Sequence, residues 1–305
     1  MNMRWRTRRG FLALSGAATL AFLALSFVTW ISPVEAGLTG RILIAGYGPE
    51  LPIFQDLAKL FEKAHPGTAV EFEWDRNVKA VELVRAGIAD LAVIDRPVPG
   101  LRDTRIAWDG IAVIVNFANP IREVSSAQLR DLFTGRVTRW SDMDGSSAKV
   151  QVFDRAPEDN VKAGFETSLG IAGQTVTPAA VVRTDQKALR AVSGNTAAIT
   201  YLSLAAALKA QEDGIPIQVL TVDKVEPGQP TVKDGSYPLR RPLYLLSREQ
   251  PSAIAEAFIA FALSAEAEPV LRTAFVPSGR PATSREAKVP GLPGDIPRTP
   301  RDTES

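Results

Sequence analysis

Short apolar runs along the chain alternate with segments in which apolar residues recur every three or four positions. The runs are typical of buried β-strands, and the periodic segments are typical of helices that pack by one face. The body begins with a strand at 40–46, a helix at 52–67, a strand at 69–74, a helix at 78–89 and a strand at 90–94. A βαβαβ order of this kind predicts a parallel sheet.

The same alternation continues as far as residue 281. Ser125 followed by Gln128 is typical of a capping box at a helix start. The further predicted elements are a strand at 109–120, a helix at 125–135, a strand at 148–155, a helix at 162–169, a strand and then a helix within 195–210, a strand at 241–247 and a helix at 252–271. The body is therefore expected to have an α/β fold. Residues 282–305 have no periodic apolar face, and we expect a disordered tail there.

The N-terminus has the pattern of an export signal. A basic head precedes an uncharged apolar run at 11–31 and the exit Val34-Glu35-Ala36, so we expect cleavage after Ala36. Because about 20 apolar residues can also span a membrane, residues 1–36 could instead stay as an anchor. The twin arginines of the head resemble a signal for export in the folded state. Both alternatives place the body outside the cytoplasm, in the periplasm or another extracytoplasmic space.

Composition argues against several classes of function. The 305-residue chain is 45% hydrophobic and 23% charged with a formal charge of +1, a balance that does not indicate nucleic-acid binding. It has no cysteine, so it has no disulfide, thiolate nucleophile or cysteine-ligated metal. The single histidine, His65, lies in a His-Pro-Gly turn with no recognisable nucleophile or metal partner. We therefore expect no enzymatic activity, no cofactor and no metal.

The stretch 151–165 has the layout of an anion-binding turn without the usual side chains. Arg155 precedes a short turn and a helix start, and the N–H groups of helix N-termini commonly bind phosphate. Glu158 and Asp159 stand where such a turn would have hydroxyls or glycines. A carboxylate about 5 Å from an anion would repel it by about 3 kcal/mol at an effective dielectric constant of about 20. Arg155 could offset this repulsion by pairing with Asp159, but it would then be less available to a ligand.

Seven motifs follow one another along the body: AGYGPELPIFQDLAKLF, ADLAVIDRPV, WDGIAVIVNFANPI, SSAQLRDLFTGRVTRWSDM, FDRAPEDNVKAGFE, NTAAITYLSL and YPLRRPLYLL. In this order and spacing the chain resembles the periplasmic phosphate-binding proteins that serve ABC importers, over residues 38–281. The resemblance implies a two-lobed α/β binding protein whose lobes close on a ligand. The first lobe would comprise 38–115 plus 238–281 and the second 116–237. Two hinge-crossing strands would lie near 110–116 and 241–246.

The resemblance also implies ligand residues. Asp95 falls on the aspartate that accepts the phosphate proton in the family, and Arg155 falls on the arginine that pairs with the phosphate charge. The hydroxyl-rich loops of the family are replaced by Gly46-Tyr47-Gly48-Pro49, Asp75-Arg76-Asn77 and Asp159-Asn160-Val161. The full set of candidates is Tyr47, Gly48, Asp75, Arg76, Asp95, Arg96, Arg155, Asp159 and Asn160. The predicted cleft therefore has mixed charge, and Asp159 argues against tight phosphate binding.

Two functions from different classes remain open. The first is a monomeric solute-binding protein that captures phosphate or another small polar ligand and delivers it to the membrane subunits of an ABC importer. The second is a sensory or interaction protein on the same fold that has lost ligand binding. A cleft of mixed charge suits a zwitterion or a ligand with both donors and acceptors, and it also suits a site that has lost its ligand.

Overall fold

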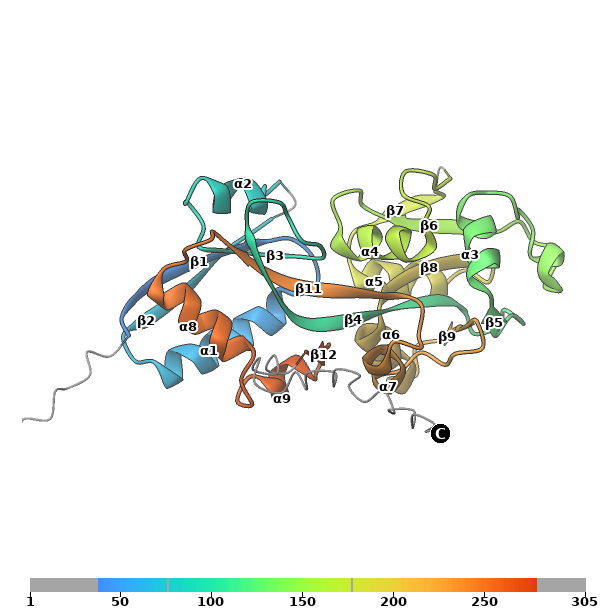
Figure 1. Cartoon of the computed structure of the whole chain (residues 1–305). Coiled ribbons are helices and arrows are strands. Elements are labelled where there is room, and N and C mark those ends of the chain that lie inside the picture. The colour runs from blue at the N-terminus through green and yellow to red at the C-terminus, as the bar shows by residue number, and fades with distance from the viewer. Residues whose placement is uncertain (1–37, 76, 177, 279–305) are drawn as a thin grey trace, which may run out of the picture. The chain divides into compact units, whose positions relative to one another are not determined.

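The computed structural model of the protein describes residues 38–75, 77–176 and 178–278 (Figure 1). The export signal predicted at 1–36 and the tail predicted at 282–305 lie outside these described residues. Across the described ranges, no helix is both long enough and apolar enough to cross a membrane.

The elements alternate between strands and helices, as the hydrophobic pattern predicts. The first half contains β1 (Gly40–Gly46), α1 (Leu51–Ala64), β2 (Thr68–Trp74), α2 (Ala80–Arg85), β3 (Leu91–Ile94), β4 (Arg102–Asn116), β5 (Glu123–Val124), α3 (Ser126–Phe133), the 3-10 helix η1 (Trp140–Met143), β6 (Gln151–Arg155) and α4 (Asn160–Leu169). The capping box at Ser125 and Gln128 is present at the start of α3. The α/β class is confirmed.

The second half completes the set, and it contains one clear departure from the predicted pattern. Its elements are β7 (Ala180–Val182), α5 (Asp185–Ser193), β8 (Ala198–Ser203), α6 (Leu204–Glu212), β9 (Ile217–Val219), β10 (Thr221–Val222), α7 (Gln229–Asp234), β11 (Arg240–Ser247), α8 (Ala253–Ala262), α9 (Glu268–Leu271) and β12 (Val276–Pro277). The helix predicted at 252–271 is divided into α8 and α9. Proline stands in the first turn of α9, where its missing N–H costs no helical hydrogen bond.

Ten of the described strands form one sheet with the order β2-β1-β3-β11-β4-β8-β6-β7, in which β9 and β12 also pair with β4, and β5 and β10 form a separate two-stranded sheet. β1 is parallel to β2 and β3, as the βαβαβ order predicts, and β11 is antiparallel to β3 and β4. β4 serves both halves of the larger sheet: residues 102–110 pair with β11, and residues 111–115 pair with β8. The strand start predicted at 109 was seven residues too late: residues 102–105 have no apolar run, and the apolar residues 106–108 just before Asp109 were also left out.

Two hydrophobic cores lie along β4. The first core contains α1, α8 and the inner face of β1, with Phe61 packed edge-on against Phe258. The second core contains α3, α4 and β8, where the rings of Phe165 and Tyr201 stack with centroids 3.8 Å apart. Ala107 belongs to the first core and Ile111 to the second, so the backbone of β4 passes from one core to the other between them.

β11 makes the same passage in the opposite direction. Leu239, just before this strand, lies in the second core, and Leu243 lies in the first. Figure 1 shows β4 and β11 running side by side through this region, in agreement with their antiparallel pairing. The two crossing strands therefore pass from one core to the other at residues 108–110 and 240–242. These positions overlap only in part with the hinge segments predicted from the sequence, 110–116 and 241–246. The bounds of the two lobes stay a prediction.

Helix α4 lies very close to β11 because Gly164 has no side chain. A Cβ atom at Gly164 would lie 2.7 Å from Cβ and 2.9 Å from Cδ of Arg241. Arg241 cannot move away at low cost, because its side chain is fully buried and bonded to carboxylates. The separation between this helix and this strand is therefore set by one glycine.

We expect Gly164→Ala to destabilise the protein by about 1–3 kcal/mol, since overpacking of a close contact outweighs the better helix propensity of alanine. Urea unfolding followed by circular dichroism measures the change. Gly194→Ala is the matched control, because a Cβ there meets only Arg190 O, at 3.5 Å. Equal midpoints for the two variants would contradict the close packing of α4 on β11.

Candidate functional site

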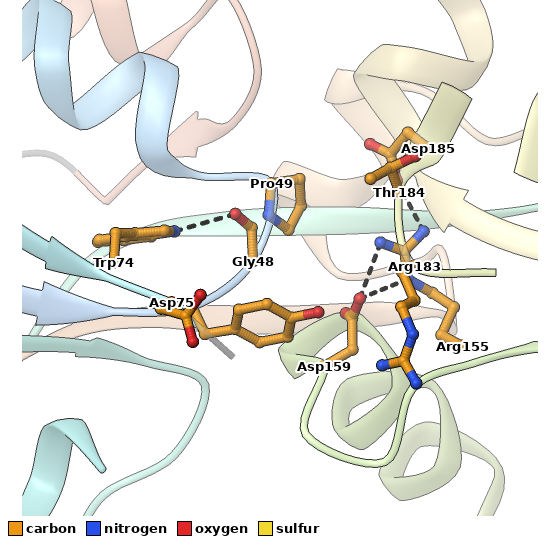
Figure 2. A pocket seen from close by; sticks show the side chains of 10 residues that line it. Gly48, Pro49, Trp74, Asp75, Arg155, Asp159, Arg183, Thr184 and Asp185 are labelled. Atoms are coloured by element: carbon orange, nitrogen blue, oxygen red, sulfur yellow. Dashed lines mark hydrogen bonds and ion pairs between the residues drawn. The ribbon is translucent and has the colours of Figure 1, made fainter. Parts of the chain in front are cut away.

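A cavity of about 410 Å³ lies where the turn after β1 faces the N-termini of α4 and α5 (Figure 2). Its lining residues are Tyr47, Gly48, Pro49, Trp74, Asp75, Arg155, Asp159, Arg183, Thr184 and Asp185. Figure 2 shows Trp74 and Asp75 on one side, opposite Arg155 and Asp159. All of them follow or end strands β1, β2, β6 and β7, and ligands of α/β sheets commonly bind at such strand ends.

Arg155 is the central cation of this cavity, and its side chain is only 1% exposed. Nε donates to Oδ2 of Asp159 at 2.9 Å, and Nη2 lies 2.9 Å from the same oxygen. Nη1 donates to Oδ1 of Asp185 at 2.7 Å. The pairing with Asp159 that the sequence suggested is therefore present, and Asp185 adds a second carboxylate. The guanidinium group is engaged by carboxylates on two sides.

Asp159 is also the N-cap of α4. Its Oδ1 accepts a hydrogen bond from the N–H of Val161 at 2.8 Å, and the residue is 1% exposed. Aspartate is a favoured N-cap, and its charge is stabilised by the helix dipole. This single carboxylate thus occupies a helix N-terminal N–H and the buried arginine together. These are two of the donors that a phosphate ion uses in a site of this type.

Asp185 reaches Arg155 from the first turn of α5. Thr184 caps this helix by accepting a hydrogen bond from the N–H of Lys187 at 3.2 Å. Burial raises the pKa of Asp185 above its ordinary value, and the neighbouring Arg155 only partly opposes this effect. The cavity therefore has a carboxylate whose negative charge is incompletely stabilised by the protein.

A second set of buried polar groups fixes the strand that carries Arg155. Asp154 accepts hydrogen bonds from the hydroxyl of Tyr201 at 2.5 Å and from the N–H of Arg155 at 2.8 Å, and it forms an ion pair with Lys162. Lys162 also lies 2.7 Å from Glu166 within α4. These contacts tie the end of β6 to α4 and so fix the direction in which Arg155 points.

The turn after β1 forms the opposite wall. The indole N–H of Trp74 donates to the carbonyl oxygen of Gly48 at 3.1 Å, and the side-chain amide of Asn160 donates to the carbonyl oxygen of Tyr47 at 2.9 Å. Gly48 has a φ of +130°, and a Cβ there would lie 2.3 Å from Oε2 of Glu50. Glycine is therefore required at position 48 both by its backbone conformation and by the close approach of a buried carboxylate.

Behind this wall lies a fully buried ion-pair group. Arg241 on β11 donates to Oε1 of Glu50 at 2.5 Å and to Oδ2 of Asp109 at 2.8 Å, and Ser203 donates to Asp109 at 3.0 Å. Among the described residues, Oε2 of Glu50 and Nη1 of Arg241 have no hydrogen-bond partner. Burial raises the pKa of Glu50 and of Asp109, and Arg241 opposes the rise in both. This group links the start of α1 to both crossing strands.

Comparison with known proteins identifies the family. A model described as the PBP superfamily domain matches residues 33–266, most of the chain. The chain belongs to this family. It is 25% identical over 247 residues to the phosphate-binding protein PstS of Staphylococcus haemolyticus, covering 74% of this chain and 77% of that protein. It is 31% identical over 111 residues to phosphate-binding protein PstS 2 of Streptococcus agalactiae, but this match covers 34% of this chain and only 38% of that relative.

The solved structures agree with the sequence matches. An ABC-type phosphate transport receptor from Vibrio cholerae superposes with a TM-score of 0.68, covering 77% of this chain and 99% of that structure at 24% identity. At this level of identity the likeness establishes the fold and not the ligand. The resemblance read from the sequence and the two-lobed α/β architecture are confirmed.

The structure brings together most of the residues singled out in the sequence. Of the nine candidates, those that line the cavity are Tyr47, Gly48, Asp75, Arg155 and Asp159. Asn160 stands beside it, bonded to Tyr47. Asp95 and Arg96 are not lining residues of this cavity; Arg96 Nη1 instead donates to Asp95 at 2.9 Å. Arg76 lies outside the described residues. The described residues contain no cluster of three or more acidic or histidine side chains suited to a metal ion.

Five lining residues were missed by the sequence analysis: Pro49 (as a lining residue), Trp74, Arg183, Thr184 and Asp185. The last three follow the short strand β7, and Thr184 has the N-cap position before α5. A threonine between an apolar strand and a helical segment was therefore the available signal. Trp74 gave no such signal, because an aromatic residue at a strand end is equally typical of a core.

We expect the stability of Glu50→Gln, relative to wild type, to increase as the pH rises from about 4 to about 7. A carboxyl group with a raised folded-state pKa stabilises the wild type below its unfolded pKa of about 4.3, and this contribution is lost as pH rises through the folded pKa. Glutamine does not titrate. The difference should change by about 1.4 kcal/mol for each pKa unit of the shift.

Urea unfolding of both proteins across this pH range measures the effect. Glu71→Gln, at an exposed position on β2, serves as the control for effects common to any glutamate-to-glutamine change. A relative stability of Glu50→Gln that falls with rising pH would show that Arg241 outweighs burial at Glu50.

Proposed function

We propose that this protein is an extracytoplasmic solute-binding protein of the phosphate-type ABC importer class, which binds a small polar ligand other than free phosphate. In this proposal residues 1–36 direct export, and the lobes 38–115 plus 238–281 and 116–237 close over the ligand. The ligand-bound protein then docks on the membrane subunits of an importer. In this proposal the protein binds its ligand and catalyses no reaction.

The cavity between Tyr47 and Arg155 is the observation that supports this proposal. It combines residues from both sides of the crossing strands, as a closing binding protein requires. Its volume of about 410 Å³ falls in the range of small-molecule sites, which is about 300–1,000 Å³. Relatives named as phosphate-binding proteins support a role in solute binding. No comparable observation among the described residues supports an enzymatic function that would use a metal ion or a nucleophile.

Phosphate is disfavoured by the carboxylates that already hold Arg155. An entering phosphate ion would have to displace Asp159 or share the guanidinium group with Asp159 and Asp185. Each charge-assisted hydrogen bond lost in that exchange costs about 1.5–3 kcal/mol. The displaced carboxylate would also remain buried close to the ion. The fold of a phosphate-binding protein is retained here while its anion donors are engaged internally.

The alternative is a sensory or interaction protein that binds no ligand. The pairs of Arg155 with Asp159 and Asp185 also favour this alternative, because an arginine that is already paired with protein carboxylates does not need a ligand to balance its charge. The two functions differ in one measurable respect, because a ligand that binds only the folded state must raise its thermal midpoint. We expect at least one compound in a panel of phosphate, phosphonates, sulfate and amino acids to raise the midpoint of the purified protein. A flat panel would favour the interaction protein.

We expect the wild type to bind inorganic phosphate weakly or not at all at neutral pH, and Asp159→Ser with Val161→Thr to strengthen binding at least about tenfold, or ~1.4 kcal/mol. Serine keeps an N-cap for α4 while it removes the carboxylate from one side of Arg155, and the new hydroxyl groups can donate to an anion. Isothermal titration calorimetry measures both affinities.

Asp142→Ser is the control for this variant, because it removes the same charge from an exposed position on η1. Tighter phosphate binding in both variants would indicate a general effect of net charge rather than release of Arg155. Submicromolar binding by the wild type would contradict the proposal of an altered ligand.

A further inference from the structure

Every described guanidinium group at the cavity already has a carboxylate partner. Arg155 is shared by Asp159 and Asp185, and Nη1 of Arg183 donates to Oε1 of Glu158 at 3.0 Å. The Arg155 side chain is almost completely buried, whereas that of Arg183 is 43% exposed and partly screened by water. An anion that entered the cavity would therefore compete with internal carboxylates at each described cation.

Two carboxylates of the cavity, in contrast to its paired guanidinium groups, keep oxygens to which no described residue donates. Asp75 uses Oδ1 to accept two hydrogen bonds from Asn77, and Asp185 uses Oδ1 for Arg155. No described residue donates to Oδ2 of Asp75 or to Oδ2 of Asp185. Three carboxylates and two guanidinium groups line the described part of the cavity, so its walls carry a surplus of negative charge. The acceptors that remain for a ligand are anionic.

Two aromatic side chains, Tyr47 and Trp74, line the same space. Trp74 is held by its hydrogen bond to Gly48 and by packing against Phe54 and Phe72, with ring centroids 6.0 and 6.3 Å apart. An ordered indole or phenol face attracts a cation by about 0.5–2 kcal/mol, depending on how dry the site is. Carboxylates combined with aromatic faces suit a protonated amine better than they suit an anion or a neutral sugar.

The carboxylates behind the cavity act in the same direction. Glu50 and Asp109, two buried carboxyl groups, share the single guanidinium group of Arg241 behind the site. Asp159 contributes to the raised pKa of Glu50, and both Asp159 and Glu158 contribute to the raised pKa of the Tyr47 phenol, after burial in each case. Burial is the main cause of both shifts, the carboxylates add to it, and arginines oppose it: Arg241 at Glu50, and Arg183 and Arg155 at Tyr47.

From these contacts we infer that the cavity between Tyr47, Trp74, Asp75 and Asp185 binds a small organic cation, a ligand with a protonated amine or guanidinium group. This inference rests on the proposed function and specifies its ligand class. The ammonium or guanidinium group donates to Asp75 and Asp185, and its alkyl part lies against the aromatic rings. Asp159 keeps Arg155 occupied and so excludes anions from the same space.

Titration calorimetry of the purified protein with putrescine, agmatine and arginine, and with phosphate and sulfate, tests this inference. We expect one or more of the three amines to bind and both anions to give no heat of binding. Asp75→Asn keeps an oxygen for its turn with Asn77 while it removes the charge, and it should weaken amine binding at least about tenfold. Glu73→Gln, two residues away and exposed on β2, is the matched control and should leave amine affinity unchanged.

Asp185→Asn provides a second variant from the other wall of the cavity, with its urea midpoint recorded to show that it is folded. Binding of anions or neutral compounds without any binding of amines would overturn the cationic ligand and leave the solute-binding function standing. Absence of binding by every compound in this panel and in the thermal panel would overturn both. Amine binding that is equally weakened by Glu73→Gln would show attraction to net charge and not recognition in the cavity.

Discussion

The buried charge of Arg241 is the constraint on which the rest of the site depends. A guanidinium group with no solvent contact is tolerated only when carboxylates and hydrogen bonds surround it. Glu50 from the start of α1 and Asp109 from β4 meet this need, so one side chain on β11 joins a helix start and both crossing strands. The turn at Tyr47 directly precedes Glu50, and α4 packs on Arg241 through Gly164. Both walls of the cavity are thus positioned by the same ion-pair group.

The same rule, applied inside the cavity, supports the proposal that the ligand differs from phosphate although the fold is the same. Arg155 is as deeply buried as Arg241 and must also be paired, whether by a ligand or by the protein. Asp159 pairs with Arg155 from the N-cap position of α4. The same side-chain conformation caps the helix and forms the ion pair. Under the proposed function, the carboxylate at this turn takes the place beside Arg155 that a bound anion would otherwise have.

Local patterns were sufficient to predict what depends on neighbours in the chain. The periodicity predicted the strands and helices of the first βαβαβ run, and the charge of Asp159 near Arg155 raised the possibility of their pairing. Asp185 and Trp74 reach the cavity through long-range pairing of strands, which no local pattern reveals. Residues 102–105 of β4 could not be predicted from an apolar run, because their strand conformation depends on hydrogen bonding to β11, whereas the apolar residues 106–108 did give a signal that the prediction left out. Asp95 matched a family position, yet its nearest charged partner here is the adjacent Arg96.

The hydrogen bonds that the cavity residues already make with one another also limit how a ligand can change the conformation of the protein. A ligand shifts an equilibrium between open and closed lobes only through contacts that differ between the two states. The bond from Asn160 to Tyr47 joins residues of the two predicted lobes, whereas the pairs of Arg155 with Asp159 and Asp185 lie within the predicted second lobe and do not contribute to closure. What remains to respond to a ligand is the second oxygen of Asp75, the second oxygen of Asp185 and the two aromatic faces. Both oxygens are anionic acceptors that any N–H or O–H donor can bind, and the cation inferred above would add charge attraction to these contacts, so it would favour closure more than a neutral ligand with the same donors.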